Sequence, residues 1–176
     1  IRTVLAEAQS AGVIESGESE MISGVMRLAD RTARGLMTPR RDVEVIDTED
    51  EPEEIRAQLR ATTRSRLPVR KGSSDEILGV LFVKDAYDFK AGGSSFDIQT
   101  AMRDAPVVSD LTGALDVIQA LRKAPAHMVL VYDEYGHFEG IVTPANLLAA
   151  IAGEFASDAE PGENPSIVVR EDGSLL

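Results

Sequence analysis

The sequence repeats one seven-residue outline, GVLFVKD at 79–85 and GIVTPAN at 140–146. Both stretches open with glycine, continue through branched or leucine side chains, and end on a short polar residue, Asp85 or Asn146. The outlines lie 61 positions apart, and flanking residues keep that offset: Leu67 matches Met128, and Val69 matches Leu130. An internal repeat of this length indicates two copies of one folding unit.

Each copy shows the order strand, helix, strand, turn, strand, helix. In the first copy this predicts strands at 43–46, 66–71 and 77–83 with helices at 52–61 and 84–91. In the second copy it predicts a strand near 107, strands at 128–132 and 138–143, and helices at 111–123 and 144–155, with Leu115, Ile118 and Leu121 inward. Because a unit of about 50 residues buries too little surface alone, we expect the two sheets to pack together. The fold class is α/β (α+β), a pseudo-twofold module with a cleft on its axis.

The flanking segments complete the expected domain organisation. The first 36 residues read as helical, with a helix ending near Gly12 and another that carries an apolar stripe, Met21, Val25 and Leu28. We interpret that stripe as core or helix-partner surface. The expected boundaries are a helical connector at 1–36, first repeat at 37–91, linker at 92–100, second repeat at 101–155, and an acidic tail at 156–176.

Composition excludes several classes of function. The net charge of −12 disfavours nucleic acid as a partner. The absence of cysteine excludes disulfides and thiolate metal sites, and two histidines are too few for an all-imidazole centre. Six carboxylates at 47–54 are either a solvated loop and helix start or a divalent-cation patch. No run of about 20 apolar residues is present, and no nucleotide-hydrolase, dehydrogenase, zinc-protease or esterase motif appears, so we expect no enzyme.

Four motifs carry a resemblance to a known family: MTPRRDV at 37–43, SRLPV at 65–69, VYDEYGHFEGIVT at 131–143 and GEF at 153–155. The repeat resembles tandem cystathionine-β-synthase-type (CBS) domains, also called a Bateman module, over about residues 37–155. Together with the motifs, it is similar to the CorC/HlyC family of magnesium and cobalt efflux, hemolysin-like proteins.

The resemblance implies further properties of the chain. The connector would follow a membrane domain of the same or a partner protein, and residues 156–176 would begin a truncated C-terminal transporter-associated domain. The module would lie on the cytoplasmic side of the cell membrane and form a homodimer through its CBS repeats. Its cleft would bind AMP, ADP or ATP, with or without magnesium, and regulate divalent-cation efflux.

GIVTPAN suits a nucleotide for physical reasons as well. If a strand ends at Thr143 and Pro144 begins a helix, Thr143 is an N-cap and Asn146 lies at N3. A helix start offers unpaired N–H groups and partial positive charge to a phosphate. The Thr143 hydroxyl would donate to phosphate, and Asn146 would reach a ribose hydroxyl. Alternatively, Thr143 only caps its helix. The family usually has Asp where Asn146 stands, which implies weaker or differently oriented ribose binding.

The first copy is less suited to a nucleotide. Phe82 stands where Thr143 stands in the second copy, and its ring cannot bind phosphate. Asp85 keeps a carboxylate of the kind that binds ribose. The asymmetry predicts one good site, in the second repeat.

Other contacts would come from across the cleft, and each has a plain alternative. The MTPR stretch would turn Thr38 and Pro39 toward adenine or ribose. Arg66, like Arg40 and Arg41, is a candidate phosphate cation or a surface charge. Tyr135 would stack on a base or belong to a turn. The remaining candidates would form an apolar slot for the purine or be core: Val45, Ile46, Pro68, Met128 and Leu130.

Two functions therefore follow from the sequence. The first is a regulatory adenosine-nucleotide-binding CBS pair of a CorC-type divalent-cation efflux protein. The second is a non-catalytic dimerisation or interaction module that binds no nucleotide.

Overall fold

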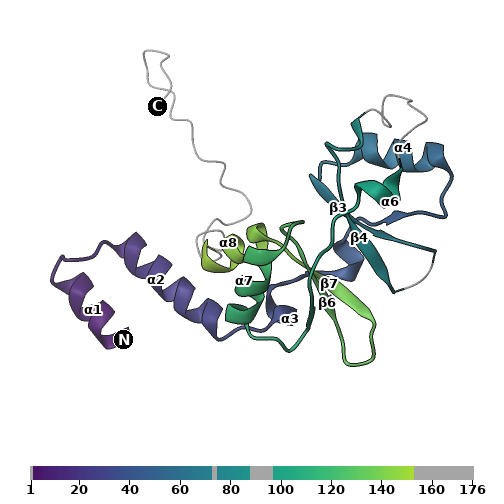
Figure 1. Ribbon diagram of the computed structural model, residues 1–176. Helices are drawn as coiled ribbons and strands as arrows, with labels where there is room; N and C mark the ends of the chain where they lie inside the picture. The colour runs from purple at the N-terminus through teal and green to yellow at the C-terminus, as the bar shows by residue number, and fades with distance from the viewer. Residues whose placement is uncertain (1, 73–74, 88–96, 153–176) are drawn as a thin grey trace, which may run out of the picture.

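The computed structural model describes residues 2–72, 75–87 and 97–152, and Figure 1 shows their arrangement. The second half of the expected helix at 84–91, the linker core at 92–95, and the segment from 153 onward lie outside the described residues. Among the described helices, none combines the length and apolar character that crossing a membrane requires. Among the described residues, no group of three or more acidic or histidine side chains is placed to hold a metal ion.

The first repeat is a three-stranded sheet with one long helix. Its elements are β2 (Ile46–Asp47), α4 (Pro52–Ala61), β3 (Arg66–Arg70) and β4 (Ile77–Phe82). The sheet order is β2-β3-β4, with β2 parallel to β3 and β3 antiparallel to β4. Helix α4 begins with a proline at its first turn, as expected, and buries Ile55 and Leu59 against the sheet.

The second repeat has the same order of elements: β5 (Val107–Ser109), α7 (Ala114–Lys123), β6 (Val129–Tyr132), β7 (Phe138–Val142) and α8 (Pro144–Ala152). A short helix, α6 (Ile98–Ala101), precedes it and packs on the first repeat's core. The sheet gains a fourth strand, β1 (Thr38–Pro39), which lies before the first repeat in the chain. β1 pairs antiparallel with β7, so the order is β1-β7-β6-β5 and the sheet is built from both ends of the sequence.

The two sheets bury a shared core, as the size of each repeat requires. Val80 and Phe82 of β4 pack with side chains of the second repeat: Ala126, Met128, Leu130, Phe138 and Ile141. A polar contact also joins the repeats, because the Tyr132 hydroxyl accepts from the Ile77 backbone N–H at 3.1 Å and donates to the Asp75 carbonyl at 3.0 Å. Burial of that hydroxyl raises the pKa of Tyr132.

Two glycines at repeat-equivalent positions, Gly79 and Gly140, allow another segment of the chain to approach closely. A Cβ at Gly140 would collide with the backbone carbonyl of Thr38, where β1 crosses β7. A Cβ at Gly79 would lie 3.1 Å from Cβ of Met102 and 3.2 Å from the carbonyl oxygen of Arg103. The leading glycine of each outline is therefore required by close approach of another segment.

Three helices precede the repeats: α1 (Arg2–Ser10), α2 (Ser16–Ala29) and α3 (Ala33–Leu36), with a short 3-10 turn, η1 (Arg40–Asp42), after β1. Helices α2 and α3 contact α7 and α8 of the second repeat. In Figure 1, α1 and α2 extend to the left of the two sheets, and α2 contacts α8. That contact is close, since a Cβ at Gly24 would collide with the Ile151 carbonyl.

Two expectations about packing are wrong in detail. The strand expected at 43–46 is only Ile46–Asp47, because the Val45 carbonyl accepts from the Gln58 side chain and lies outside the sheet ladder. On α7 the buried residues are Ala114, Val117 and Leu121, and Leu115 is 59% exposed, because the small Ala114 faces α3 in the core.

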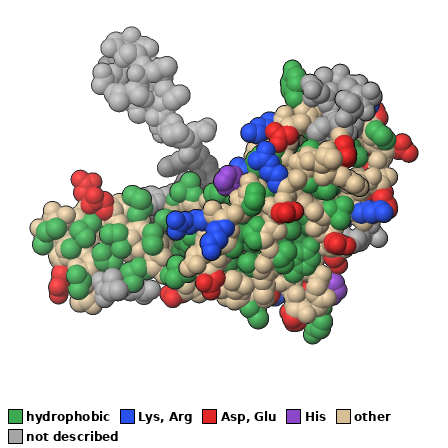
Figure 2. Space-filling view, viewed as in Figure 1, with side chains coloured by type: hydrophobic (Ala, Val, Ile, Leu, Met, Phe, Trp, Pro, Cys, Tyr) green, Lys and Arg blue, Asp and Glu red, His purple; other side chains and the backbone are tan. Residues whose placement is uncertain are grey.

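The apolar stripe of α2 lies partly in the core and partly on the surface. Leu28 is buried in the core with α3 and α7, and Gly24, beside the stripe, is buried against α8. Met21 and Val25 are each 51% exposed. Figure 2 shows hydrophobic side chains on the surface of the N-terminal helices, at the left of the view. The role of helix-partner surface stays a prediction.

Candidate nucleotide site

A cleft of about 270 Å³ opens between the repeats where the sequence predicts one. Four segments line it: the chain from β1 to just past η1, the start of β3, the residue before β6, and the junction of β7 with α8. The lining residues are Thr38, Asp42, Val43, Glu44, Arg64, Ser65, Arg66, Leu67, Pro68, Met128, Ile141, Thr143, Pro144 and Ala145. Both repeats therefore contribute to one concave surface of a size suited to part of a small ligand.

Three polar side chains form a connected group at the α8 end of the cleft. The Thr143 backbone N–H and hydroxyl both donate to Asn146 Oδ1, at 2.9 and 2.8 Å. Asn146 Nδ2 donates to the Thr38 hydroxyl at 3.0 Å. Asn146 thus links the start of α8 to β1 by hydrogen bonds, and its side-chain carbonyl oxygen accepts two of them. The Thr38 hydroxyl proton and the Thr143 lone pairs are left for a ligand.

The opposite side of the cleft carries charge of both signs. Arg64 Nε lies 3.5 Å from Glu44 Oε1, and the other Glu44 oxygen accepts from the Thr62 hydroxyl at 2.7 Å. Arg66 Nη1 donates to the His127 carbonyl at 3.1 Å, which directs the guanidinium across the repeat boundary. A phosphate group here would meet two arginines.

The floor between these polar ends is apolar. Leu67, Met128 and Ile141 are 1%, 2% and 9% exposed and reach the cleft through their edges, next to Pro68 and Val43. An aromatic base would bury apolar surface on such a floor.

The structure brings some of the sequence-predicted residues to this cleft and places others elsewhere. Five line it: Thr38, Arg66, Pro68, Met128 and Thr143. Asn146 contacts two of these, and Pro39 pairs with Gly140 beside the cleft.

The other candidates lie outside the lining. Ile46 and Leu130 are core residues, 0% and 2% exposed, so the core alternative holds for both. Val45 borders a different hollow, together with Arg40 and Arg41.

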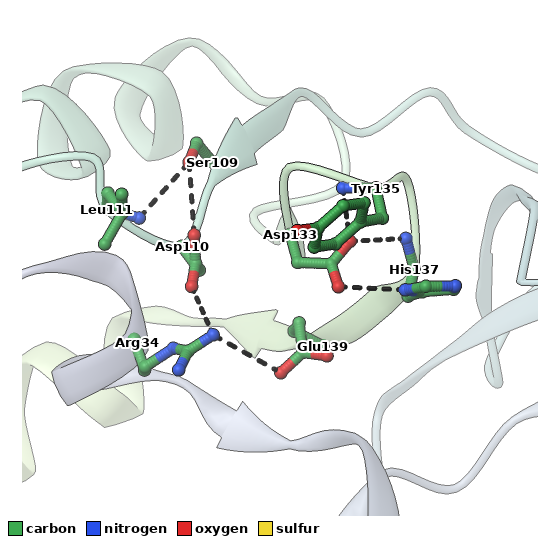
Figure 3. A network of polar contacts seen from close by, with 8 residues as sticks. All are labelled: Arg34, Ser109, Asp110, Leu111, Asp133, Tyr135, His137 and Glu139. Carbon is green, nitrogen blue, oxygen red and sulfur yellow. Dashed lines mark hydrogen bonds and ion pairs between the residues drawn. The ribbon is translucent and has the colours of Figure 1, made fainter.

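Tyr135 is on the exposed turn between β6 and β7, as Figure 3 shows, and is 77% exposed. Its backbone N–H donates to Asp133 Oδ1 at 2.9 Å, which supports the turn alternative. Partial burial favours a higher pKa for Asp133, but hydrogen bonds from the backbone and ring of His137 outweigh it and lower that pKa. The same side-chain hydrogen bond raises the pKa of His137.

The same figure shows how α3 is held against the second repeat. Arg34 Nη2 lies 2.5 Å from Asp110 Oδ2 and 4.0 Å from Glu139 Oε2. Asp110 is 1% exposed, and Ser109 Oγ donates to its other oxygen at 3.2 Å. Because only Met37 separates α3 from Thr38, this network positions the segment that supplies the Thr38 hydroxyl to the cleft.

Asp85, predicted as the first-repeat ribose ligand, is instead bound within the chain. Arg103 Nη2 donates to Asp85 Oδ2 at 2.9 Å. Arg103 is the structural counterpart of Thr38, since its bridge to Val80 corresponds to the pairing of Thr38 with Ile141. The first repeat therefore has the Arg103–Asp85 ion pair at the position where the second repeat has the hydrogen-bonded pair Thr38 and Asn146.

Nine lining residues were not among the sequence-predicted site residues: Asp42, Val43, Glu44, Arg64, Ser65, Leu67, Ile141, Pro144 and Ala145. Their signal was weak, because charged residues next to strands usually face solvent. The alternation of acid and valine in DVEV and the polar run TTRSR are the features that could have indicated a shared surface.

Comparisons with known proteins show which family the chain resembles. A family model described as the CBS domain matches residues 96–153. The UPF0053 protein sll0260 of Synechocystis is 38% identical over all of this chain, and the UPF0053 inner membrane protein YoaE of Escherichia coli K12 is 36% identical over 94% of it. The chain spans 39% and 31% of the length of these two relatives.

Solved structures are similar as well. The CBS domain of a bacterial CNNM/CorC family Mg²⁺ transporter matches with a TM-score of 0.74 and 30% identity, covering 86% of this chain and 93% of the other. A structure of such a CBS domain in complex with ATP matches with a TM-score of 0.67 and 30% identity, covering 78% and 98%. A CBS-domain pair with bound AMP from Klebsiella pneumoniae matches with a TM-score of 0.60 and 26% identity, covering 70% and 99%.

The fold and the relatives define a tandem CBS module. The chain belongs to the CBS-domain modules of the CNNM/CorC (CorC/HlyC) family.

Proposed function

We propose that this module binds an adenosine nucleotide in the cleft between its repeats and thereby regulates a divalent-cation transporter of the CorC type. The observation that carries the proposal is the cleft itself, which combines hydroxyls at a helix start, an apolar floor and arginines from the facing repeat. Related CBS modules with ATP or AMP bound support the ligand class.

In the proposed complex, the purine lies on the apolar floor beside Pro68 and Met128. The ribose meets the hydroxyls of Thr38 and Thr143, and Asn146 holds both in place. The phosphates face Arg64 and Arg66. This assignment changes the expected role of Asn146 from ribose ligand to positioning residue, because its carbonyl oxygen already accepts two hydrogen bonds.

Magnesium would enter with the phosphates. Asp42 and Glu44 line the same cleft as the two arginines, so a nucleotide with several phosphates would bring its own charge toward two carboxylates. A divalent cation between phosphate and carboxylate oxygens relieves that repulsion, and oxygen ligands suit Mg²⁺. We therefore expect ATP or ADP to need magnesium more than AMP does.

Nucleotide would act on the rest of the protein through α8. This helix begins at the cleft, and its far part contacts α2, the helix that leads toward the expected membrane domain. A ligand shifts such an arrangement only by its different affinity for the two states. We place the module at the cytoplasmic side of the membrane, as a homodimer, and assign it no catalytic step. Cobalt is a second candidate cargo beside magnesium.

A non-catalytic dimerisation module that binds no nucleotide is the second candidate. The observation that favours it is the internal use of Asn146 and Asp85, both of which are hydrogen-bonded within the chain. Exposed apolar residues on α7 and α8, Leu115 at 59% and Leu148 at 67%, would then serve the interface.

Thermal unfolding of the 176-residue chain with AMP, ADP or ATP, each with and without magnesium, separates the two candidates. A nucleotide at 100 times its dissociation constant adds about 2.7 kcal/mol to the unfolding free energy, which is several degrees in Tm for a chain of this size. Thr143→Val should abolish most of the shift. Thr48→Val, whose hydroxyl lies outside the cleft lining, is the matched control and should keep it.

No shift with any nucleotide would reject the sensor and favour the dimerisation module. An equal shift in the wild type and Thr143→Val would place the ligand elsewhere. Hydrogen exchange of α2 tests the path through α8: nucleotide that stabilises the protein but leaves α2 exchange unchanged would reject that path.

A further inference from the structure

Glu44 contacts Arg64 in two ways on the arginine side of the cleft. Its Oε1 lies 3.5 Å from Arg64 Nε, and its Oε2 accepts from the Thr62 hydroxyl at 2.7 Å. The same Thr62 oxygen accepts from the Arg64 backbone N–H at 3.1 Å. Thr62 is the residue at which α4 ends, so the three side chains are anchored to a helix end. Glu44 therefore holds the Arg64 guanidinium directly and its backbone through Thr62.

The second arginine of the cleft has a different environment. Arg66 Nη1 donates to the neutral carbonyl of His127, and Arg66 Nε is buried without an acceptor. Among the described residues, no carboxylate pairs with Arg66, whereas Arg64 has Glu44 beside it. An entering phosphate therefore competes with a charged partner at Arg64 but not at Arg66.

The Glu44–Arg64 ion pair is open to exchange with a ligand. The Glu44 and Arg64 side chains are 41% and 64% exposed, so water and salt screen their attraction. Exposed pairs of this kind typically change an equilibrium by no more than about fivefold. A phosphate that binds the Arg64 guanidinium leaves Glu44 without this partner. The affinity for that nucleotide is then lower by the strength of the lost ion pair.

We propose that Glu44 is a specificity-determining residue of the nucleotide cleft, which lowers the affinity for nucleotides whose phosphates reach Arg64. This role rests on the proposed function, because it presupposes that the cleft binds an adenosine nucleotide. Adenosine has no phosphate with which to displace Glu44, so its affinity is independent of the ion pair. ATP has the longest phosphate chain among AMP, ADP and ATP, and its affinity is lowered most. Glu44 therefore sets how strongly the cleft distinguishes a nucleotide from its nucleoside.

Glu44→Gln tests the proposal with little structural change, because a glutamine carbonyl still accepts from the Thr62 hydroxyl. Calorimetry with the 176-residue chain gives the dissociation constants of adenosine and ATP, the latter in magnesium and in EDTA. We expect Glu44→Gln to bind ATP about two- to fivefold more tightly than the wild type. The affinity for adenosine should change by less than about 1.5-fold. Glu54→Gln removes the same charge from an exposed position of α4 outside the cleft lining and should change neither affinity.

The Arg64→Gln background separates competition for Arg64 from direct repulsion between Glu44 and phosphate. If Glu44 acts through Arg64, adding Glu44→Gln to Arg64→Gln should raise ATP affinity by less than about 1.5-fold. Asp42→Asn is the matched control, because Asp42 lines the same cleft but pairs with Arg41 at 3.6 Å. Its effect on ATP affinity should be the same with and without Arg64.

Three results would overturn the proposal while the proposed function stands. They are equal ATP affinity of the wild type and Glu44→Gln, an equal gain for adenosine, and a gain that persists in Arg64→Gln. If neither the wild type nor Glu44→Gln binds adenosine or ATP, the proposed function itself is rejected and this role of Glu44 with it. Both side chains are largely in solvent, so thermal unfolding without ligand should find each variant folded.

Discussion

Alanine at Gly140 should damage this protein far more than alanine at Gly79, although the two glycines are repeat equivalents. A Cβ at Gly140 would lie well under 3.0 Å from the Thr38 carbonyl oxygen, a backbone atom that cannot rotate away. At Gly79 the nearest contact is 3.1 Å, to the side-chain Cβ of Met102. Alanine at Gly140 would therefore force the backbone of β1 to move, whereas alanine at Gly79 requires its neighbours to shift by only a few tenths of an ångström.

The expected loss in unfolding free energy follows from the movement that the new methyl group at Gly140 forces on β1. To restore ordinary contact, β1 would shift from β7 by roughly 1 Å. We estimate about 1–3 kcal/mol for the overpacking and about 1 kcal/mol for a weakened ladder hydrogen bond, offset by roughly 0.4–1 kcal/mol from the lower chain entropy of alanine. The net loss is about 1–3.5 kcal/mol, or roughly 2–14 °C in Tm. For Gly79→Ala we expect about 1 kcal/mol or less.

Urea and thermal unfolding of both variants measure the difference. Gly35→Ala is the control, because its nearest neighbour, Arg31 Cβ, would lie 3.8 Å from the new methyl group. The control should match or slightly exceed the wild type in stability. Equal losses at Gly79 and Gly140, or a Gly140→Ala variant as stable as the control, would refute the inference that the β1 crossing has no room for a side chain.

Two other perturbations test the junction of the repeats and the β6–β7 turn. Tyr132→Phe removes the hydroxyl that bonds Ile77 and Asp75, so we expect a loss of about 1–3 kcal/mol in denaturant unfolding; an unchanged midpoint would show that the hydroxyl does not join the repeats. The pKa of His137 is raised above 6.5 by its hydrogen bond to Asp133, so its contribution is fully present below pH 6.5 and is lost as pH rises through the raised value. The stability difference between wild type and His137→Ala should therefore shrink across that window. A difference that is constant with pH would show that the ion pair does not form in solution.

Much of the architecture was predictable because the repeat imposes it twice. Once Gly79 and Gly140 are aligned, the strand, helix and hairpin order of one copy supports that of the other. Thr143 was a candidate because a helix start follows it, and Thr38 because the MTPR stretch was expected across the cleft; both line the cleft. The motifs that resemble the family led to the same fold.

Other features depend on tertiary contacts that local patterns do not encode. Ile46 and Leu130 are as compatible with an apolar slot as with core, and only packing decides between them. Met21 and Val25 have the period of a buried stripe, but Gly24 lets α8 approach another side of the helix.

The pairing of β1 with β7 has a consequence for synthesis of the chain. Thr38 and Asn146, whose side chains share a hydrogen bond, are 108 residues apart. At ribosomal rates the second partner emerges roughly 5–20 s after the first. During that interval β1 has no partner strand, and the first repeat lacks the face that covers Val80 and Phe82. Such long-range closure slows folding, so the module completes its cleft only as a final step, and a ribosome stalled before β7 would hold a chain with an exposed apolar sheet.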